Sequence, residues 1–160
     1  MADLVPIARA LGKRRGLGKR PRDRYAAVRD KGRVMAKAER LRIFFDGGCR
    51  PNPGRMEIAV VARGQALIER DIGDGSSMDA EWLALLRAVG VARSLGLDEA
   101  VLLGDSAPVV AQANAALAGD ARRSAHADAL RAAATGLTLR VRHIKRTQNL
   151  AGIALARLPR

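Results

Sequence analysis

Apolar runs closed by turn residues predict three strands in the first half of this sequence. Residues 41–45 form a run of strand-forming residues, and Asp46 ends it before a turn rich in glycine and proline that closes at Gly54. Residues 56–62 and 66–70 form two more runs of the same kind. Because the connections between the three are too short for crossovers, we expect an antiparallel meander.

At Met78 the spacing of the apolar positions changes from that of a strand to that of a helix. One helical face carries Met78, Trp82, Leu85, Leu86, Val89 and Ala92. The pattern ends at Gly96, which is a typical helix terminator. The long segment between the third and fourth strands therefore predicts a crossover helix.

The second half of the chain adds two strands and three helices to this pattern. Residues 100–104 predict a fourth strand, and two helices follow over 108–117 and 121–134. Residues 137–144 alternate apolar and polar side chains as a fifth strand does, and 150–158 predict a short closing helix. We therefore predict an α/β fold with a five-stranded mixed sheet, three strands antiparallel and two parallel, flanked by helices.

Positive charge is concentrated at the start of the chain and sets the predicted domain boundary. Of the net charge of +13, residues 1–40 carry +9, from 13 Lys and Arg against 4 Asp and Glu. We predict a basic, flexible N-terminal arm over residues 1–40 and one domain over residues 41–160. The arm has two interpretations, a polyanion-binding segment and a solvated tail that only aids solubility.

The cysteine and hydropathy patterns indicate the compartment. Cys49 is the single cysteine, so no internal disulfide can form and a reducing environment is expected. No apolar run has the length of a membrane span, and the N-terminus lacks a secretory apolar segment. We expect a cytoplasmic monomer that does not bind membranes, with an Arg-rich organellar presequence as the alternative interpretation of the arm.

Three acidic residues are placed so that the predicted fold would bring them together. Asp46 ends the first strand, Asp105 ends the fourth, and Glu81 lies on the crossover helix between them. If the first and fourth strands are parallel neighbours, both aspartates lie at one sheet edge. Three converging carboxylates need cations, and oxygen ligands favour Mg²⁺ or Mn²⁺. The alternative for Asp46 is that it only caps the turn.

Four ordered motifs resemble those of the ribonuclease H family, in its short bacterial and reverse-transcriptase-like branch. They are FDGGCRPNPG from Phe45, AEWLALLRAV from Ala80, LLGDS from Leu102 and HIKRTQN with the following ALA from His143. The resemblance implies an endonuclease that cuts RNA in RNA–DNA hybrids and leaves a 5′-phosphate. It also implies that Asp46, Glu81 and Asp105 ligate two Mg²⁺ or Mn²⁺ ions as the catalytic residues.

The sequence departs from the family pattern at two places. Ile153 takes the place of a fourth carboxylate and Gly152 that of an alanine, so the resemblance implies that one of the two ions is held more weakly. The other interpretation of Ile153 is that it packs with Leu150 on the inner face of the closing helix. Ser77 and Met78 replace two asparagines that read the minor groove in relatives; Ser77 retains a hydrogen-bonding hydroxyl.

The expected partner is nucleic acid, either an RNA–DNA hybrid or RNA. The predicted contacts are Asn52, Ser77, Arg140, Arg142, Lys145, Arg146 and Asn149. Exposed arginines on strands also occur without any function, so the alternative for Arg140 and Arg142 is that they are surface residues with no functional role. Two rival hypotheses stay open: a nucleic-acid-binding module that has lost hydrolysis, motivated by Ile153, and a protein-interaction domain in which only the arm contacts RNA.

Other reactive side chains have structural interpretations beside the functional ones. His143 is either a proton shuttle or a structural residue at a strand end, and His126 is expected on the surface. For Cys49 no base is identifiable, so we expect a small turn residue rather than a nucleophile. Trp82 has the spacing of a core residue, with stacking on a base or sugar as the alternative.

Overall fold

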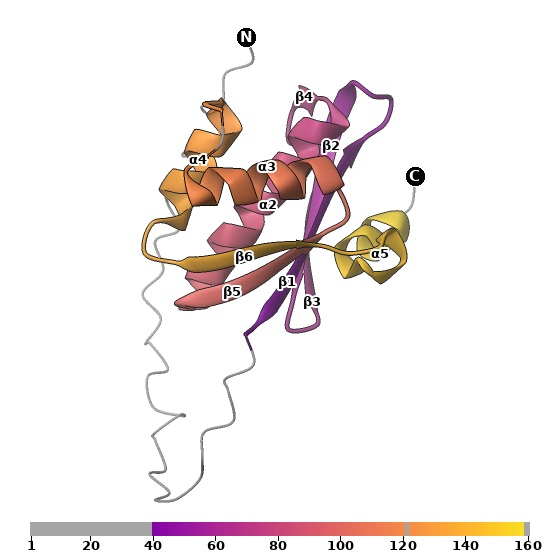
Figure 1. Ribbon diagram of the computed structural model, residues 1–160. Helices are drawn as coiled ribbons and strands as arrows, with labels where there is room; N and C mark the ends of the chain where they lie inside the picture. Colours follow the sequence, from indigo (N-terminus) through magenta and orange to yellow (C-terminus); the bar gives the residue numbers. More distant parts are fainter. Residues whose placement is uncertain (1–39, 121, 159–160) are drawn as a thin grey trace, which may run out of the picture. The chain divides into compact units, whose positions relative to one another are not determined.

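The computed structural model describes residues 40–120 and 122–158, and the predicted basic arm lies outside them except for its last residue, Arg40 (Figure 1). The described chain forms a mixed sheet in the order β3-β2-β1-β5-β6, with a two-residue strand, β4, that also pairs with β2. The predicted fold class is therefore confirmed. Within the described ranges, no helix is both long and apolar enough to cross a membrane.

The antiparallel half of the sheet follows the predicted meander. β1 (Arg42–Cys49) pairs with β2 (Gly54–Ala62), which pairs with β3 (Gln65–Glu69). The predicted loop over 71–77 contains β4 (Asp74–Gly75), whose backbone pairs with the start of β2. That expectation was wrong because a strand of two residues leaves no alternation in the sequence.

β1 continues four residues past the end of its apolar run, and this corrects the prediction of a turn at Asp46. Asp46 pairs with Ala59 and Cys49 with Met56, so the antiparallel ladder passes through both glycines between them. Partner residues on β2 supply the backbone hydrogen bonds that glycine propensity alone does not predict. Asp46 is therefore a mid-strand residue with a fixed backbone.

The parallel half of the sheet consists of β5 and β6. β5 (Glu99–Gly104) pairs in parallel with β1 on one side and with β6 (Thr138–His143) on the other. On β6, Val141 is buried while Arg140 and Arg142 are exposed, as the alternation predicts. The prediction that the first and fourth strands of the sequence are parallel neighbours is confirmed.

Four α-helices and one short 3₁₀ helix, η1 (Arg146–Gln148), occur in the described chain, and the first α-helix crosses from the meander to the parallel half. α2 (Ser77–Ser94) is capped by Ser76, whose Oγ accepts a hydrogen bond from the amide of Asp79 in a reciprocal capping box. Its inner face buries Trp82, as predicted, but Met78 is 45% exposed because it lies in the first turn, beyond the sheet. The remaining helices are α3 (Ala107–Ala118), α4 (Ala125–Ala134) and α5 (Leu150–Ala156).

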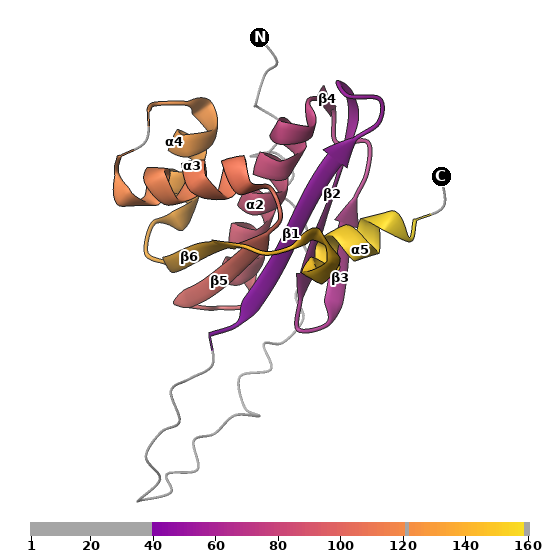
Figure 2. The ribbon, with the colours of Figure 1, turned by 45° about the vertical axis from the view of Figure 1, so that its right-hand side comes forward.

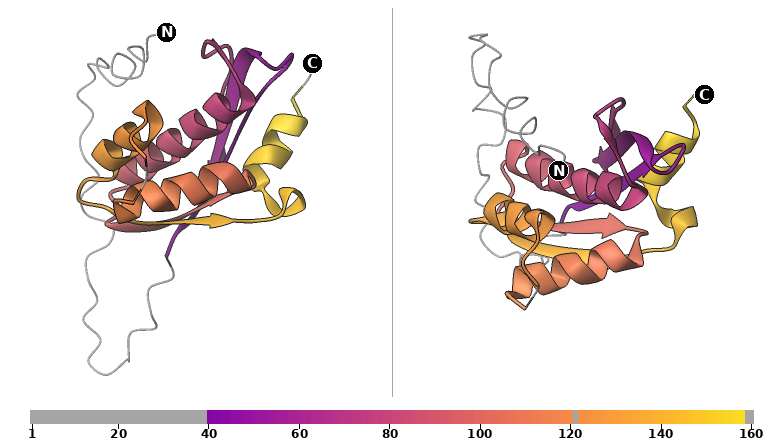
Figure 3. Two further views of the ribbon diagram at one scale, coloured as in Figure 1. Left: turned by 45° about the horizontal axis from the view of Figure 1, so that its top comes forward. Right: turned by 90° about the horizontal axis from the view of Figure 1, so that it is seen from above.

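The helices form layers on both faces of the sheet (Figures 2 and 3). The main core lies under α2, α3 and α4 and includes Ile43, Trp82, Leu102 and Val141. α5 lies across the opposite face of β1, β2 and β3, where Ala151 packs with Ala59 and Val61. The expected contact of Ile153 with Leu150 on an inner face is wrong: Leu150 is 45% exposed, and α5 packs through Ala151, Ala154 and Leu155.

His126 joins two helices and is not a free surface residue, which corrects the expectation for it. Its ring stacks on Trp82 with the centroids 5.3 Å apart and the planes 5° from parallel. Its Nε2 lies 3.0 Å from Oδ1 of Asp79. The half-buried imidazole therefore connects α4 to the first turn of α2.

Candidate active site

The pairing of β1 with β5 sets the two aspartates side by side. Ile43 pairs with Leu102 and Phe44 with Leu103. The same register carried two residues further brings Asp46 level with Asp105, which directly follows β5. The parallel sheet thus provides two adjacent carboxylates, one within a strand and the other just after a strand.

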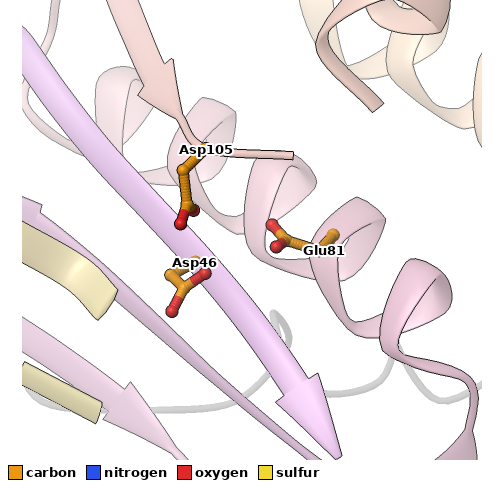
Figure 4. A group of neighbouring side chains, drawn as sticks. All are labelled: Asp46, Glu81 and Asp105. Atoms are coloured by element: carbon orange, nitrogen blue, oxygen red, sulfur yellow. The ribbon is translucent and has the colours of Figure 1, made fainter. Parts of the chain in front are cut away.

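Close packing of α2 on β1 adds the third carboxylate. A Cβ atom at Gly47 would lie only 2.2 Å from the carbonyl oxygen of Ala80, so the glycine allows the helix backbone to contact the strand directly. Glu81 is the next residue of the helix, and its side chain points toward Asp46 and Asp105 (Figure 4). One carboxylate oxygen from each of the three lies within 4.8 Å of the others.

Burial and mutual repulsion make two of these carboxylates, Asp46 and Glu81, unusually weak acids. Burial, followed by the charge of Asp105, raises the pKa of Asp46 to about 7, and the Arg146 guanidinium opposes this rise. Burial, followed by the charges of Asp46 and Asp105, raises the pKa of Glu81 to about 9. Without a cation, Asp46 and Glu81 therefore hold protons that exposed carboxyl groups would lose well below neutral pH.

The cluster has the chemistry of a divalent cation site. All donors are carboxylate oxygens, the ligand type of Mg²⁺, Mn²⁺ and Ca²⁺. Oε2 of Glu81 is buried and has no hydrogen-bond partner among the described residues. A cation would satisfy that oxygen and remove the repulsion that raises the pKa values, so the residues present fit such a group.

Asn149 is fully buried, and this corrects the prediction that it contacts nucleic acid. Its Nδ2 donates to Oδ1 of Asp105 at 2.8 Å and to the carbonyl oxygen of Phe45 at 3.0 Å. Its Oδ1 accepts from the amide of Ala151 at 3.2 Å and so caps α5. Asparagine before an apolar helix is the sequence signal of a cap, but its bond to Asp105 spans 44 residues and leaves no local pattern.

Helix α5 approaches the cluster without adding an acid to it. A Cβ atom at Gly152 would lie 2.9 Å from Oδ2 of Asp46, so the helix backbone passes very close to this carboxylate. Ile153 is half-buried and offers no ligand atom, and no Asp or Glu follows Asp128 in the sequence. The described site thus has three carboxylates and no fourth.

A cavity of about 610 Å³ lies beside Asp46 and Glu81 and is lined by four arginines and four carboxylates. Its arginines are Arg50, Arg55, Arg70 and Arg146. Arg55 pairs with Asp71 at 3.1 Å and Arg70 with Glu57 at 3.4 Å. Of the predicted basic contacts only Arg146 lines this cavity, while Arg140, Arg142 and Lys145 are exposed outside it. The other three arginines were missed because they come from separate turns and strands.

Asn52 and Ser77 are joined by a hydrogen bond beside the cavity. The amide of Ser77 donates to Oδ1 of Asn52 at 3.1 Å, and Sγ of Cys49 donates to the same oxygen at 3.5 Å. Cys49 is buried at the end of β1, so it is a structural residue, although of a strand and not of a turn. The turn after β1 is thereby fixed to the start of α2, with Ser77 lining the cavity.

This fold and this arrangement of acids define a ribonuclease H-like protein. A family model described as reverse transcriptase-like matches residues 44–158, so the chain belongs to that family. No curated protein matches the chain.

Solved structures of ribonucleases H share the fold. The chain is 26% identical to RNase H1 from the halophilic archaeon Halobacterium salinarum, with a TM-score of 0.60 over 73% of this chain and 94% of that one. An RNase H domain from Mycobacterium tuberculosis is 24% identical, with the same TM-score and the same coverages. LC11-RNase H1, solved in complex with an RNA/DNA hybrid, is 24% identical, with a TM-score of 0.59 over 69% and 89% of the chains.

Proposed function

We propose that the protein is a divalent-metal-dependent endonuclease that hydrolyses the RNA strand of RNA–DNA hybrids. The observation that carries this proposal is the convergence of Asp46, Glu81 and Asp105 to within 4.8 Å in a family of ribonuclease H-like proteins. LC11-RNase H1, which shares the fold, was solved in complex with an RNA/DNA hybrid, and this supports the same substrate class.

In this proposal the three carboxylates hold Mg²⁺ or Mn²⁺ at the scissile phosphate. Such an ion, when bound, supplies a water of lowered pKa and neutralises charge on the leaving oxygen. Asn149 holds Asp105 in place through its 2.8 Å hydrogen bond. Arg146 lines the same cavity as Asp46 and Glu81, where its guanidinium can donate two hydrogen bonds to a phosphate.

Ser77 provides the contact to the sugar in the same proposal. The hydroxyl of Ser77 is half-exposed in the cavity wall and can donate to, or accept from, a ribose 2′-hydroxyl. Asn52 keeps Ser77 at this position through the bond to its amide. In this proposal, the first turn of α2 distinguishes RNA from DNA.

The number of ions follows from the ligands available. Family resemblance implies two ions, but Ile153 stands where α5 would supply the acid for the second. We therefore expect one ion bound by Asp46, Glu81 and Asp105, and a second bound only at higher metal concentration.

A cleavage assay tests the proposal directly. Purified protein is incubated with a labelled RNA–DNA hybrid and Mg²⁺ or Mn²⁺, beside an Asp46→Asn variant and an Asp120→Asn control in an exposed turn. We expect 5′-phosphate products from the wild type and the control, and a loss of at least about 100-fold in the Asp46 variant. Products that do not depend on Asp46 would defeat the proposal.

A second candidate function, a nucleic-acid-binding module without turnover, is favoured by the lack of an acid on α5. It predicts salt-sensitive binding with no cleavage at any metal concentration. Ile153→Asp separates the two candidates. A large gain of cleavage would show a crippled site, and unchanged, Asp46-dependent cleavage would show a site adapted to three acids.

A further inference from the structure

The sheet face that carries the two aspartates continues away from them as a basic surface. In register, Arg42 pairs with Val101 and Val101 with Arg140, so these three form one row across β1, β5 and β6. Side chains that are paired across strands point to the same face. In the next row Phe44, Leu103 and Arg142 are aligned in the same way.

This face is the one opposite the main core. Ile43, Leu102 and Val141, which alternate with the residues of those rows, are buried under the helices on the other side. Asp46 follows Phe44 by two residues and Asp105 follows Leu103 by two, so both acids extend the same face. The rows and the acids therefore lie on the same side of the sheet.

Arg42, Arg140 and Arg142, here called the basic sheet face, are all exposed. The described helices that pack on β5 and β6 are α2 and α3, which lie on the core side, whereas α5 lies over β1, β2 and β3. Glu99 lies one row further from the acids and pairs with Arg40 at 2.7 Å. The rows nearest the acids thus present arginines beside a small apolar strip.

The positive charge of the basic sheet face and its position next to the acids favour binding of a polyanion that also occupies the active site. Arg142 lies one strand away from Asp105 and two residues, about 7 Å, back along the strand direction. Arg140 lies a further two residues away in the same line. A phosphodiester strand with its scissile bond at the acids would meet these guanidinium groups next, and guanidinium groups pair well with phosphates.

We propose that the basic sheet face binds the sugar–phosphate backbone of the substrate on one side of the cleavage point. This rests on the proposed function, because the acids fix where the strand lies. The contact is made to phosphates and so carries no sequence preference. The contact extends the substrate-binding surface toward β6, away from the cavity that Arg146 lines.

The test compares two double variants with the same loss of charge. Arg140→Gln with Arg142→Gln removes the two arginines of β6, and Arg122→Gln with Arg123→Gln removes two exposed arginines between α3 and α4. All proteins carry Asp46→Asn so that hybrid is bound and not cut. Any contribution of residues 1–40 is common to every protein and cancels in the comparison.

Hybrid affinity is measured from about 50 to 200 mM salt. We expect the slope of log K against log salt to become shallower by about 1.5 in the β6 variant, as for two lost phosphate contacts, and by less than about 0.5 in the control. Equal slopes in the two variants, or hybrid affinity unchanged by the β6 substitutions, would overturn the proposal.

A second measurement locates the contact on the substrate. Hybrids shortened from one end or the other are bound to the Asp46→Asn protein with and without the β6 substitutions. Shortening one end should weaken binding only while Arg140 and Arg142 are present; equal losses in both proteins would contradict the proposal. Asp46-dependent cleavage by the otherwise unmodified protein is scored separately, so the basic sheet face can fail while the nuclease proposal stands.

Discussion

At the scale of single residues, Gly152 controls the position of a candidate metal ligand. Its missing Cβ leaves the space that Oδ2 of Asp46 occupies, at 2.9 Å from where that atom would be. The carboxylate is the mobile end of a side chain, so it can rotate away from an added methyl group at small cost. Rotation would, however, take it out of the cluster that it forms with Glu81 and Asp105.

Gly152→Ala should therefore weaken cation binding more than it changes stability. We expect Mn²⁺ affinity to fall by about tenfold, equivalent to about 1.4 kcal/mol, when measured by calorimetric titration. Gly90→Ala is the matched control, because a Cβ atom there meets nothing within 4 Å. Unchanged Mn²⁺ affinity in the Gly152 variant would show that Gly152 does not control the position of Asp46 as a ligand.

Asn149 is the second residue whose role depends on distant contacts. Asn149→Ala leaves a buried carbonyl of Phe45 without its donor and frees Asp105, so we expect a loss of about 2 kcal/mol in the free energy of unfolding together with weaker Mn²⁺ binding. Asn114 also donates from Nδ2 to a strand carbonyl, that of Val141 at 2.9 Å. Asn114→Ala should lower stability without changing Mn²⁺ affinity; an equal effect of both variants on Mn²⁺ would contradict this account.

The acids could be predicted from the sequence, but the residues that position them could not. Asp46, Glu81 and Asp105 each stand beside a strong pattern of strand or helix, which indicates where their side chains lie. Asn149 and Gly152 act through contacts with residues more than 40 positions away. Such contacts depend on the angle at which α5 crosses the sheet, which periodicity does not specify.

At the scale of elements, the contact between α2 and β1 delivers Glu81 to the site. The two backbones meet at Gly47, where a Cβ atom would lie 2.2 Å from a carbonyl oxygen of the helix. Neither backbone can move aside without breaking the ladder of β1 with β2 or the hydrogen bonds of the helix. The geometry of the three carboxylates therefore depends on the close backbone contact at Gly47.

Gly47→Ala should separate the helix from the strand. We expect a loss of about 3 kcal/mol or more in the free energy of unfolding, measured by urea denaturation, because the added methyl group overpacks two rigid backbones. Gly48→Ala in the next position meets nothing within 4 Å and should change stability by less than about 1 kcal/mol. Equal stabilities of the two variants would show that α2 does not contact β1 as described.

Element boundaries were predicted less well than element types. The sequence indicates β1 through its apolar residues, yet the strand continues through Gly47 and Gly48 because β2 pairs with them. β4 exists only as a partner of β2. Both are effects of neighbouring strands, which local propensity does not contain.

At the scale of the whole molecule, the acid cluster links stability to pH and to metal. Protons bind Asp46 and Glu81 more tightly in the folded protein, where their pKa values are about 7 and 9, than in the unfolded chain. The stability that this provides is complete below about pH 4 and is lost as pH rises through 7 toward 9. A cation that binds the ionised carboxylates of the folded protein offsets this loss of stability at high pH.

Glu81→Gln should consequently stabilise the metal-free protein at pH 8. We expect a gain on the order of 1 kcal/mol, read as a higher unfolding temperature, and no gain at pH 4, where the glutamate is protonated in both states. Mg²⁺ should raise the unfolding temperature of the wild type at pH 8 and that of the variant much less. A variant less stable than the wild type at pH 8 without metal would contradict the raised pKa.

The central claim is that three carboxylates from β1, α2 and the end of β5 hold one divalent cation, and diffraction tests it most directly. Crystals of the protein soaked in Mn²⁺ are measured at a wavelength where manganese scatters anomalously. The account predicts an anomalous peak in contact with oxygens of Asp46, Glu81 and Asp105, and no such peak in Asp46→Asn crystals. Mn²⁺ found elsewhere in the wild type, with those three carboxylates left unliganded, would contradict it.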